Sequence, residues 1–542
     1  MHLIKRAGTL AVMAFGVMIA GRATAKAVPA CSVSAIAAIA PKGSTITSAA
    51  PAITGSVSYC QVAASISTNP QLNDVINYEV GLPDPSVWNS RFVFVGNGVF
   101  AGLLPTVAGT TYYFTALQDD YAVAGTDTGH QSTDITDASW ALGNTTAIQD
   151  YDYLAVHQVT QAAQSLIASY YGSRIQDSYF DGCSTGGRQG IVEAEDYPAD
   201  FNGIVAGDPA ISDFPLGFNW NEQATLAPGG QPPPSAVNLV DQAVVKQCGD
   251  PTGPAAGLVL DPPACNFQVA SLECPAGKSP PGCLTAAQVA TFEAIYQGAT
   301  AGGVQYYPGY SVSDPADGGT NDGGWSTAIF GCTETSCPAP QPGSSEPWGV
   351  ANNGEPIGPI QWVVQDGYLK YFVFENASFD TLTLSFANVN ALDDVDDVTS
   401  VNGSDGSNVQ GLNKFANLGH KLIVYHGWSD PVLSPYVSQN FYTSAQSVLG
   451  ANMSDSVRLF MVPGMHHCTG GPGPNTFDML PAVRSWVEQG TAPDAIIATH
   501  YQNNNPNNPV QRTMPLCSWP ELPTYNGSGS YMLASSWSCV AP

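Results

Sequence analysis

Hydrophobic residues fall into two patterns along this chain, and each pattern predicts a different element. Short runs of aromatic and aliphatic residues, typical of buried strands, occupy positions 91–95, 121–124, 178–180, 421–427 and 457–462. Between 150 and 171, hydrophobic residues recur at helical spacing and Gly172 follows, which predicts a helix that ends at a glycine. Strands that alternate with helices predict an α/β fold, a parallel sheet with helices on both faces.

The regular alternation fades from about Asp213 to Asn390. This region is rich in Pro and Gly, contains six cysteines, and has aromatic residues without a clear period. It could be a loop-rich decoration of the sheet or an inserted, disulfide-rich lid domain. We expect a lid at 211–395, because the candidate catalytic residues lie on either side of it. The core would then consist of residues 26–210 and 396–542.

The N-terminus has the features of a secretion signal. Lys5 and Arg6 precede an apolar run, and Ala23-Thr24-Ala25 resembles a cleavage site. The alternative is a transmembrane anchor, but the run is shorter than the roughly 20 residues that span a bilayer. We therefore expect residues 1–25 to be a signal peptide and the mature protein to be secreted or periplasmic.

Composition narrows the choice of partners. The chain has 44 acidic and 16 basic residues, a formal charge of −28. The negative electrostatic field of such a charge repels phosphate backbones and anionic lipid, so we expect neither nucleic-acid nor membrane binding.

The 12 cysteines suggest six disulfides in an oxidising compartment. Zinc binding is the alternative, but the closely paired cysteines of a zinc site do not occur. The oligomeric state is not predicted by the sequence.

A nucleophile motif follows the predicted strand at 178–180. Gly182-Cys183-Ser184-Thr185-Gly186 fits the pattern GxSxG, in which small residues allow a sharp turn from strand to helix and expose the serine. The motif also occurs by chance as a structural turn. The strand before it and the helix expected after it favour Ser184 as a nucleophile.

A serine nucleophile needs a base and an acid. In α/β-hydrolases these follow in the order Ser, then Asp or Glu, then His. Asp430 follows the strand at 421–427, and His466 and His467 follow the strand at 457–462. The order Ser184, Asp430, His467 therefore fits a catalytic triad. The proposed lid lies between the nucleophile and the acid, which would place it over the active site.

Cysteines flank both ends of this candidate site. Cys183 precedes Ser184 and Cys468 follows His467. If they are bonded, the disulfide fixes the base against the nucleophile. One alternative is Cys183 itself as the nucleophile, and another is a metal cluster of His466, His467 and Cys468. An oxidised, even cysteine count disfavours the first, and adjacent residues rarely converge on one ion.

An oxyanion hole needs two hydrogen-bond donors. The backbone N–H of Thr185 would be one. The other should come from the loop after an early strand, Gly96-Asn97-Gly98. The glycines of this loop are equally typical of a plain tight turn.

Taken together, these motifs resemble those of the tannase and feruloyl esterase family, which includes a terephthalate-monoester hydrolase. The pairing of Cys183-Ser184 with Asp430 and His467-Cys468 is the hallmark of that family. The resemblance extends to Tyr179–Gly190, Gly203–Gly207, Tyr425–Asp430 and Val462–Met465. It covers almost the whole mature chain, from about Cys31 to Cys539.

The resemblance implies an α/β-hydrolase core with a serine triad and a Cys183–Cys468 disulfide. It also implies that Asn97 and Thr185 supply the oxyanion N–H groups, and that Trp325 of the lid binds the substrate ring. The remaining bridges it implies are Cys31–Cys60, Cys248–Cys265, Cys274–Cys283 and Cys517–Cys539, which leaves Cys332–Cys337.

One departure from the family concerns calcium. Family lids hold this ion in an Asp-rich loop after the first lid cysteine, whereas the loop Cys248–Leu258 keeps a single carboxylate, Asp250. Calcium requires six to eight oxygen ligands. We therefore expect no metal and no cofactor.

The sequence thus predicts a secreted serine carboxylesterase that hydrolyses esters of aromatic acids, hydroxycinnamic or gallic, through an acyl-enzyme. A small aromatic ester would be its partner. The alternative within the family is a terephthalate-monoester hydrolase. An alternative of another class is an inactive hydrolase fold that acts as a binding protein, which the intact triad disfavours.

Overall fold

The structure is a computed structural model. It describes residues 28–542, except 70–73, 250–252, 254, 256, 314, 317–323, 334–335, 342, 351–356, 389, 394 and 397–407. The predicted signal peptide therefore lies outside the described residues. Among the described residues, no helix combines the length and the apolar character needed to cross a bilayer.

A nine-stranded sheet forms the centre of the molecule, in the order β1-β2-β3-β5-β4-β6-β7-β10-β11. Its parallel strands confirm the predicted α/β core. Five lie at or near the expected positions: β4 (Arg91–Val95), β5 (Ala122–Thr126), β6 (Asp177–Cys183), β10 (Lys421–Gly427) and β11 (Val457–Val462). The sixth, β7 (Gly203–Gly207), was not predicted as a strand. An antiparallel extension that the hydrophobic pattern does not predict lies at one edge, made of β1 (Ser44–Thr54), β2 (Val57–Asn69) and β3 (Asp74–Pro83).

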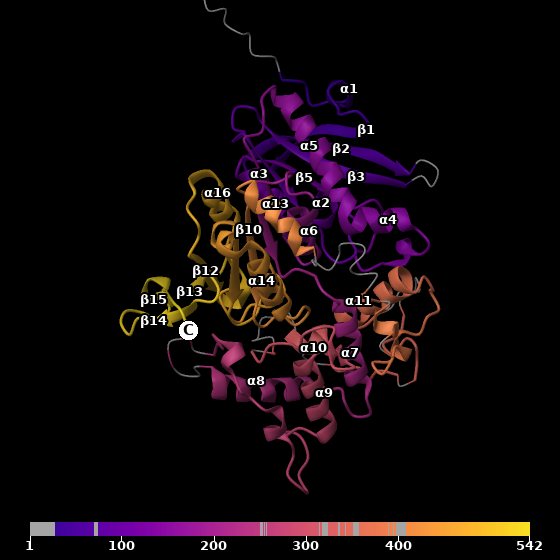
Figure 1. The fold of residues 1–542 in the computed structure, drawn as a ribbon, viewed down its shortest axis with the longest axis vertical. Coiled ribbons are helices and arrows are strands. Elements are labelled where there is room, and N and C mark those ends of the chain that lie inside the picture. Colours follow the sequence, from indigo (N-terminus) through magenta and orange to yellow (C-terminus); the bar gives the residue numbers. More distant parts are fainter. Residues whose placement is uncertain are drawn as a thin grey trace, which may run out of the picture.

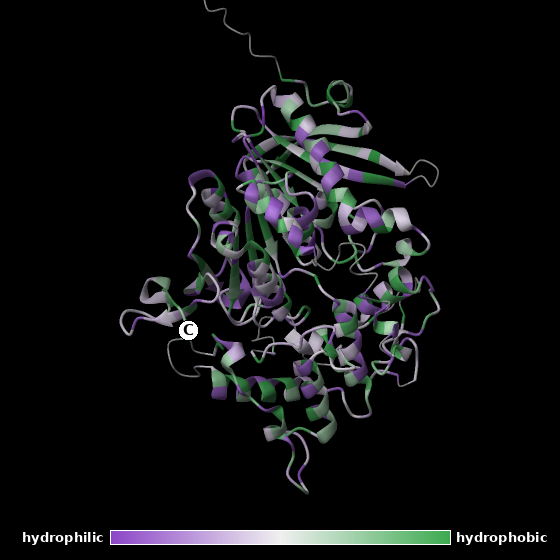
Figure 2. Cartoon of the chain, in the orientation of Figure 1, coloured by the Kyte–Doolittle hydropathy of each residue, from purple (hydrophilic) through white to green (hydrophobic). Residues whose placement is uncertain are grey.

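Helices cover both faces of the sheet, because alternate strand residues point to opposite sides. In β4, Phe92 and Phe94 join one hydrophobic cluster and Val93 and Val95 join another. The first cluster includes residues from α5 (Ala155–Tyr171), α6 (Thr185–Asp196) and α14 (Tyr436–Leu449). The second includes α3 (Thr111–Gln118) and α16 (Leu480–Gln489). Hydrophilic and hydrophobic residues alternate along α5, as expected of a helix that covers a sheet (Figure 2).

The segment between β7 and β10 forms a separate group of helices. Figure 1 shows them gathered at the end of the molecule away from β1–β3. They are α7 (Phe214–Leu226), α8 (Pro234–Cys248), α9 (Ala286–Gln297), α10 (Gly324–Ala328) and α11 (Ile360–Tyr368), with the small hairpin β8 (Thr300–Ala301) and β9 (Val304–Gln305). This segment corresponds to the expected lid, and we refer to it below as the lid.

The remaining elements are short. They are α1 (Val33–Ala37), α2 (Pro105–Ala108), α4 (Thr145–Gln149), α13 (Leu412–Asn417), α15 (Met453–Ser456) and the hairpins β12 (Ala495–Tyr501) with β13 (Val510–Cys517) and β14 (Leu522–Tyr525) with β15 (Trp537–Val540). All 12 cysteines are paired, in the five disulfides that the family resemblance implies and in the Cys332–Cys337 bridge that it leaves over.

Candidate active site

Ser184 occupies a strained turn between β6 and α6. Its backbone φ of 65° and ψ of −122° lie in a region that non-glycine residues rarely adopt. The neighbouring glycines make this turn possible. A Cβ at Gly182 would lie 2.8 Å from the carbonyl of Gly186, and a Cβ at Gly186 would lie 3.1 Å from the carbonyl oxygen of Asn97. The spacing of the GxSxG motif therefore has a steric cause.

Asp430 follows β10 and is buried. Its Oδ1 accepts hydrogen bonds from the backbone N–H groups of Val432 (2.7 Å) and Leu433 (2.9 Å), and its Oδ2 lies 2.7 Å from His467 Nδ1. Burial by itself would raise the pKa of Asp430, but the imidazoles of His467 and His426 lower it below its ordinary value. Asp430 is therefore an ionised carboxylate that orients the base.

His467 follows β11 and lines the same cavity as Ser184. Burial lowers the pKa of His467, but the carboxylate of Asp430 outweighs this effect and raises the pKa above its ordinary value. With Nδ1 bonded to Asp430, the other ring nitrogen is left to act on the serine. Both sequence-predicted partners of Ser184 are thus brought to one site.

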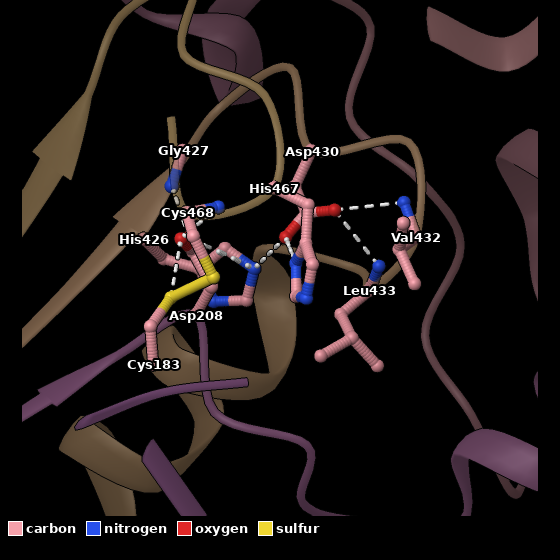
Figure 3. The surroundings of a disulfide bond; sticks show 9 residues. All are labelled: Cys183, Asp208, His426, Gly427, Asp430, Val432, Leu433, His467 and Cys468. Atoms are coloured by element: carbon pink, nitrogen blue, oxygen red, sulfur yellow. Dashed lines mark hydrogen bonds and ion pairs between the residues drawn. A yellow bond between two sulfur atoms is a disulfide. The ribbon is translucent and has the colours of Figure 1, made fainter. Parts of the chain in front are cut away.

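The disulfide Cys183–Cys468 joins the nucleophile turn to the histidine loop, with the two Cα atoms 6.0 Å apart. Because both sulfurs are bonded, Cys183 is not a free thiol nucleophile and Cys468 is not a free metal ligand. Behind the disulfide lies Asp208, which follows β7. It accepts hydrogen bonds from the N–H groups of Cys468 (2.8 Å) and Gly427 (2.7 Å) and links three loops of the site (Figure 3).

Asp208 and His426 are buried members of the site that the sequence analysis did not select. Burial raises the pKa of Asp208 to about 6. Each residue lies at the carboxyl end of a parallel strand, the edge where catalytic residues gather in open α/β sheets. That position is the sequence signal by which both could have been found.

The lid holds the loop that carries the acid, residues 428–434, called the acid loop below. Tyr310 Oη donates to the carbonyl of Val432 (2.6 Å), and Ser313 Oγ donates to the carbonyl of Trp428 (2.8 Å). Gln361 Nε2 donates to Tyr310 Oη (2.6 Å) and contacts the carbonyls of Pro431 and Val432, both at 3.0 Å. The lid therefore supports the acid as well as covering the site.

A cavity of about 340 Å³ adjoins the triad. Its walls are mostly apolar, and the lid contributes Phe214 and Phe218 from α7 and Ile360, Val364 and Tyr368 from α11. One charged residue besides His467 lines it. This residue, Arg188, is buried, lies 3.2 Å from Asp152, and has its guanidinium 4.5 Å from the ring centre of Tyr151.

Two residues implied by the family resemblance do not take the expected positions. Trp325 is absent from the cavity wall. It is buried inside the lid against Phe292, Tyr296 and Tyr310, so its expected role in binding the substrate ring is wrong. Aromatic residues of α7 and α11 occupy that wall instead.

The expectation for Asn97 also fails. Its backbone N–H donates to Gln189 Oε1 at 3.0 Å, and a donor bonded within the protein is not available to an oxyanion. Asn97 lines the cavity, as do Gly98 and Thr185, which is the first residue of α6. Because the Asn97 N–H is engaged by Gln189, we take the N–H groups of Gly98 and Thr185 as the candidate donors.

The expected absence of calcium from the loop Cys248–Leu258 stays a prediction, because Asp250 lies outside the described residues. Within the described part of the chain, three groups of potential ligands come together. Two of them are made of residues of the catalytic network. The third consists of His157, Glu193 and Asp200, where His157 Nδ1 already bonds to Asp200 at 2.7 Å.

The family model described as tannase and feruloyl esterase matches residues 60–540. The chain belongs to this family. It is 31% identical to an uncharacterized esterase of Xanthomonas campestris, over 92% of this chain and 86% of the relative. It is 30% identical to the mono(2-hydroxyethyl) terephthalate hydrolase of Piscinibacter sakaiensis, over 89% of this chain and 85% of the relative.

The crystal structure of feruloyl esterase B from Aspergillus oryzae is also similar. It has a TM-score of 0.76 and 24% identity, over 93% of this chain and 98% of that chain. This likeness supports the tannase-type α/β-hydrolase fold. Family membership also confirms that the chain is a carboxylic ester hydrolase.

Proposed function

We propose that this protein is an exported serine carboxylesterase that hydrolyses esters of aromatic acids whose ring carries no free carboxylate, such as hydroxycinnamic and gallic esters. The observation that carries the proposal is that Ser184 and His467 line the same apolar, aromatic-walled cavity. Feruloyl esterase and tannase relatives support the chemical class. The six disulfides support export to the periplasm or the medium.

The reaction would proceed through an acyl-enzyme. His467 takes the proton of Ser184 as its oxygen attacks the ester carbonyl, and Asp430 stabilises the resulting imidazolium. The N–H of Thr185 and a second N–H from the 96–99 loop, which we assign to Gly98, would bind the oxyanion. His467 then protonates the leaving alcohol, and water releases the acid by the same steps.

The distribution of cations favours uncharged acyl rings over terephthalate monoesters. Between 211 and 395 the chain has three basic residues, Lys246, Lys278 and Lys370. The first two are exposed, and Lys370 Nζ lies 2.6 Å from Glu346 and 2.7 Å from Asp366. The lid therefore offers no free cation for a substrate carboxylate, and burial of an unpaired carboxylate is costly.

A matched pair of esters tests the proposal. Dimethyl terephthalate and monomethyl terephthalate differ by one carboxylate, and methyl ferulate and methyl gallate complete the panel. We expect kcat/KM to be at least about tenfold higher for the diester, equivalent to about 1.4 kcal/mol. A monoester turned over as well as the diester would contradict the proposed specificity, and Arg188 would then be the cation to substitute in search of the partner of the carboxylate.

The Ser184→Ala variant is the control for the reaction itself. It should lose all but a trace of turnover and its labelling by a fluorophosphonate, with unchanged thermal unfolding. A binding protein with a hydrolase fold would show neither turnover nor fluorophosphonate labelling before the substitution. Turnover that survived the substitution would reject the serine mechanism.

A further inference from the structure

His426 lies four residues before Asp430, at the end of β10, and its side chain is completely buried. Its Nδ1 is 2.8 Å from Ser438 Oγ of α14. Its Nε2 is 3.2 Å from Asp430 Oδ2 and 3.8 Å from Asp208 Oδ1. Figure 3 shows its ring beside the carboxylate oxygen that His467 also contacts. The catalytic acid is therefore contacted by two imidazoles.

The surroundings determine where His426 carries its hydrogen. Two carboxylates face Nε2, and an unprotonated nitrogen there would oppose two acceptors. Nε2 therefore carries a hydrogen, and Nδ1 accepts one from the hydroxyl of Ser438. This tautomer places an N–H group 3.2 Å from Asp430 Oδ2, an ion-pair contact that is not aligned as a regular hydrogen bond.

We propose that His426 is a positioning residue of the triad, a second imidazole that holds the Asp430 carboxylate and shares its negative charge. The inference rests on the proposed esterase function. In a triad without it, His467 would be the only imidazole on Asp430, whose other oxygen would keep its backbone donors Val432 and Leu433. Its carboxylate would then be more basic and would hold the His467 imidazolium more strongly. His426 thus both orients the acid and limits the basicity of the base.

Other titratable groups face this cluster. Burial raises the pKa of Asp208, from the loop after β7, to about 6, so this carboxyl titrates within the assay range, and each variant is compared with a wild-type enzyme that carries the same Asp208. The phenols of Tyr425, Tyr307 and Tyr310 act on the two carboxylates from β10 and the lid. Burial raises the pKa of each phenol, so they remain neutral during an assay at pH 5–9.

The pH dependence of kcat/KM tests the proposal, with p-nitrophenyl butyrate as substrate. His426→Leu removes the N–H donor. We expect kcat to fall about tenfold with KM little changed, and the acidic midpoint to move up by about half to one pH unit, because the loss of a donor favours the His467 imidazolium. His426→Gln can place an amide N–H near the same position and should restore most of the rate and move the midpoint back.

Ser438→Ala provides a milder perturbation, because it removes only the partner of Nδ1. It should shift the midpoint in the same direction by a smaller amount. Thermal unfolding of each variant reports on folding separately. A His426→Leu enzyme with the wild-type midpoint would overturn the proposal, and so would equal losses in the Leu and Gln variants without a shift. If Ser184→Ala is inactive in the same assays, such a result rejects the role of His426 while the proposed function stands.

Discussion

Replacing Cys183 and Cys468 together with alanine should affect both stability and catalysis. The bond closes a loop with a sequence separation of 285 residues. In the chain-entropy model, its loss costs about 5–6 kcal/mol of unfolding free energy. The Cys274–Cys283 bond of the lid has a separation of 9 residues, and the same model gives about 2.5 kcal/mol for its loss. That pair serves as the matched control.

The two variants should differ more clearly in turnover. Cys183 and Cys468 are the immediate neighbours of Ser184 and His467, and a misplacement of about 1 Å can cost a factor of about 100 in rate. Asp208 still bonds to the N–H of residue 468, so the loop should remain near its place. We therefore expect kcat to fall about 10–100-fold in the Cys183–Cys468 variant and to stay unchanged in the control.

Equilibrium unfolding in urea without reductant measures the stabilities, and steady-state kinetics with methyl ferulate measures kcat. The proposed clamp on catalysis is refuted if the Cys183→Ala, Cys468→Ala variant turns over at the wild-type rate. Equal destabilisation of the two variants would contradict the entropic argument.

Two further predictions concern the acid and the base. Gln361→Ala removes a lid donor from the Pro431 and Val432 carbonyls and should lower kcat about tenfold with little change in KM. Its control is Gln365→Ala, because the Gln365 side chain bonds to Asn219 and Thr381 within the lid. Equal kinetics for both variants would contradict the lid's support of the acid. Because the pKa of His467 is raised, the acidic midpoint of kcat/KM should lie above about pH 6.5. Below that midpoint kcat/KM should fall about tenfold per pH unit. A midpoint below about pH 6 would contradict the ion pair of His467 with Asp430.

The triad could be predicted from the sequence because its signals are local. Glycines at fixed spacing around Ser184 and short hydrophobic runs before Asp430 and His467 each report on one strand and the loop that follows it. The order of these segments then specifies the fold. By contrast, β1–β3 contain many small polar residues, and the pairing between the strands organises them more than a local hydrophobic run does.

The errors for Asn97 and Trp325 share a physical cause. Whether a backbone N–H is available depends on a side chain 92 positions away, that of Gln189, and no local pattern encodes this contact. The lid aromatics lack a clear period, so the sequence does not separate those that fill its interior from those that face the cavity. His426 was overlooked because its importance arises only when β7, β10 and β11 lie side by side.

The support of the acid loop by lid side chains limits how such enzymes can be recombined. A graft of the lid from a relative would exchange the cavity wall, but it would also replace Tyr310, Ser313 and Gln361. A chimera designed for a new substrate would have to retain these three donors, or the new specificity would come with a loosened catalytic carboxylate.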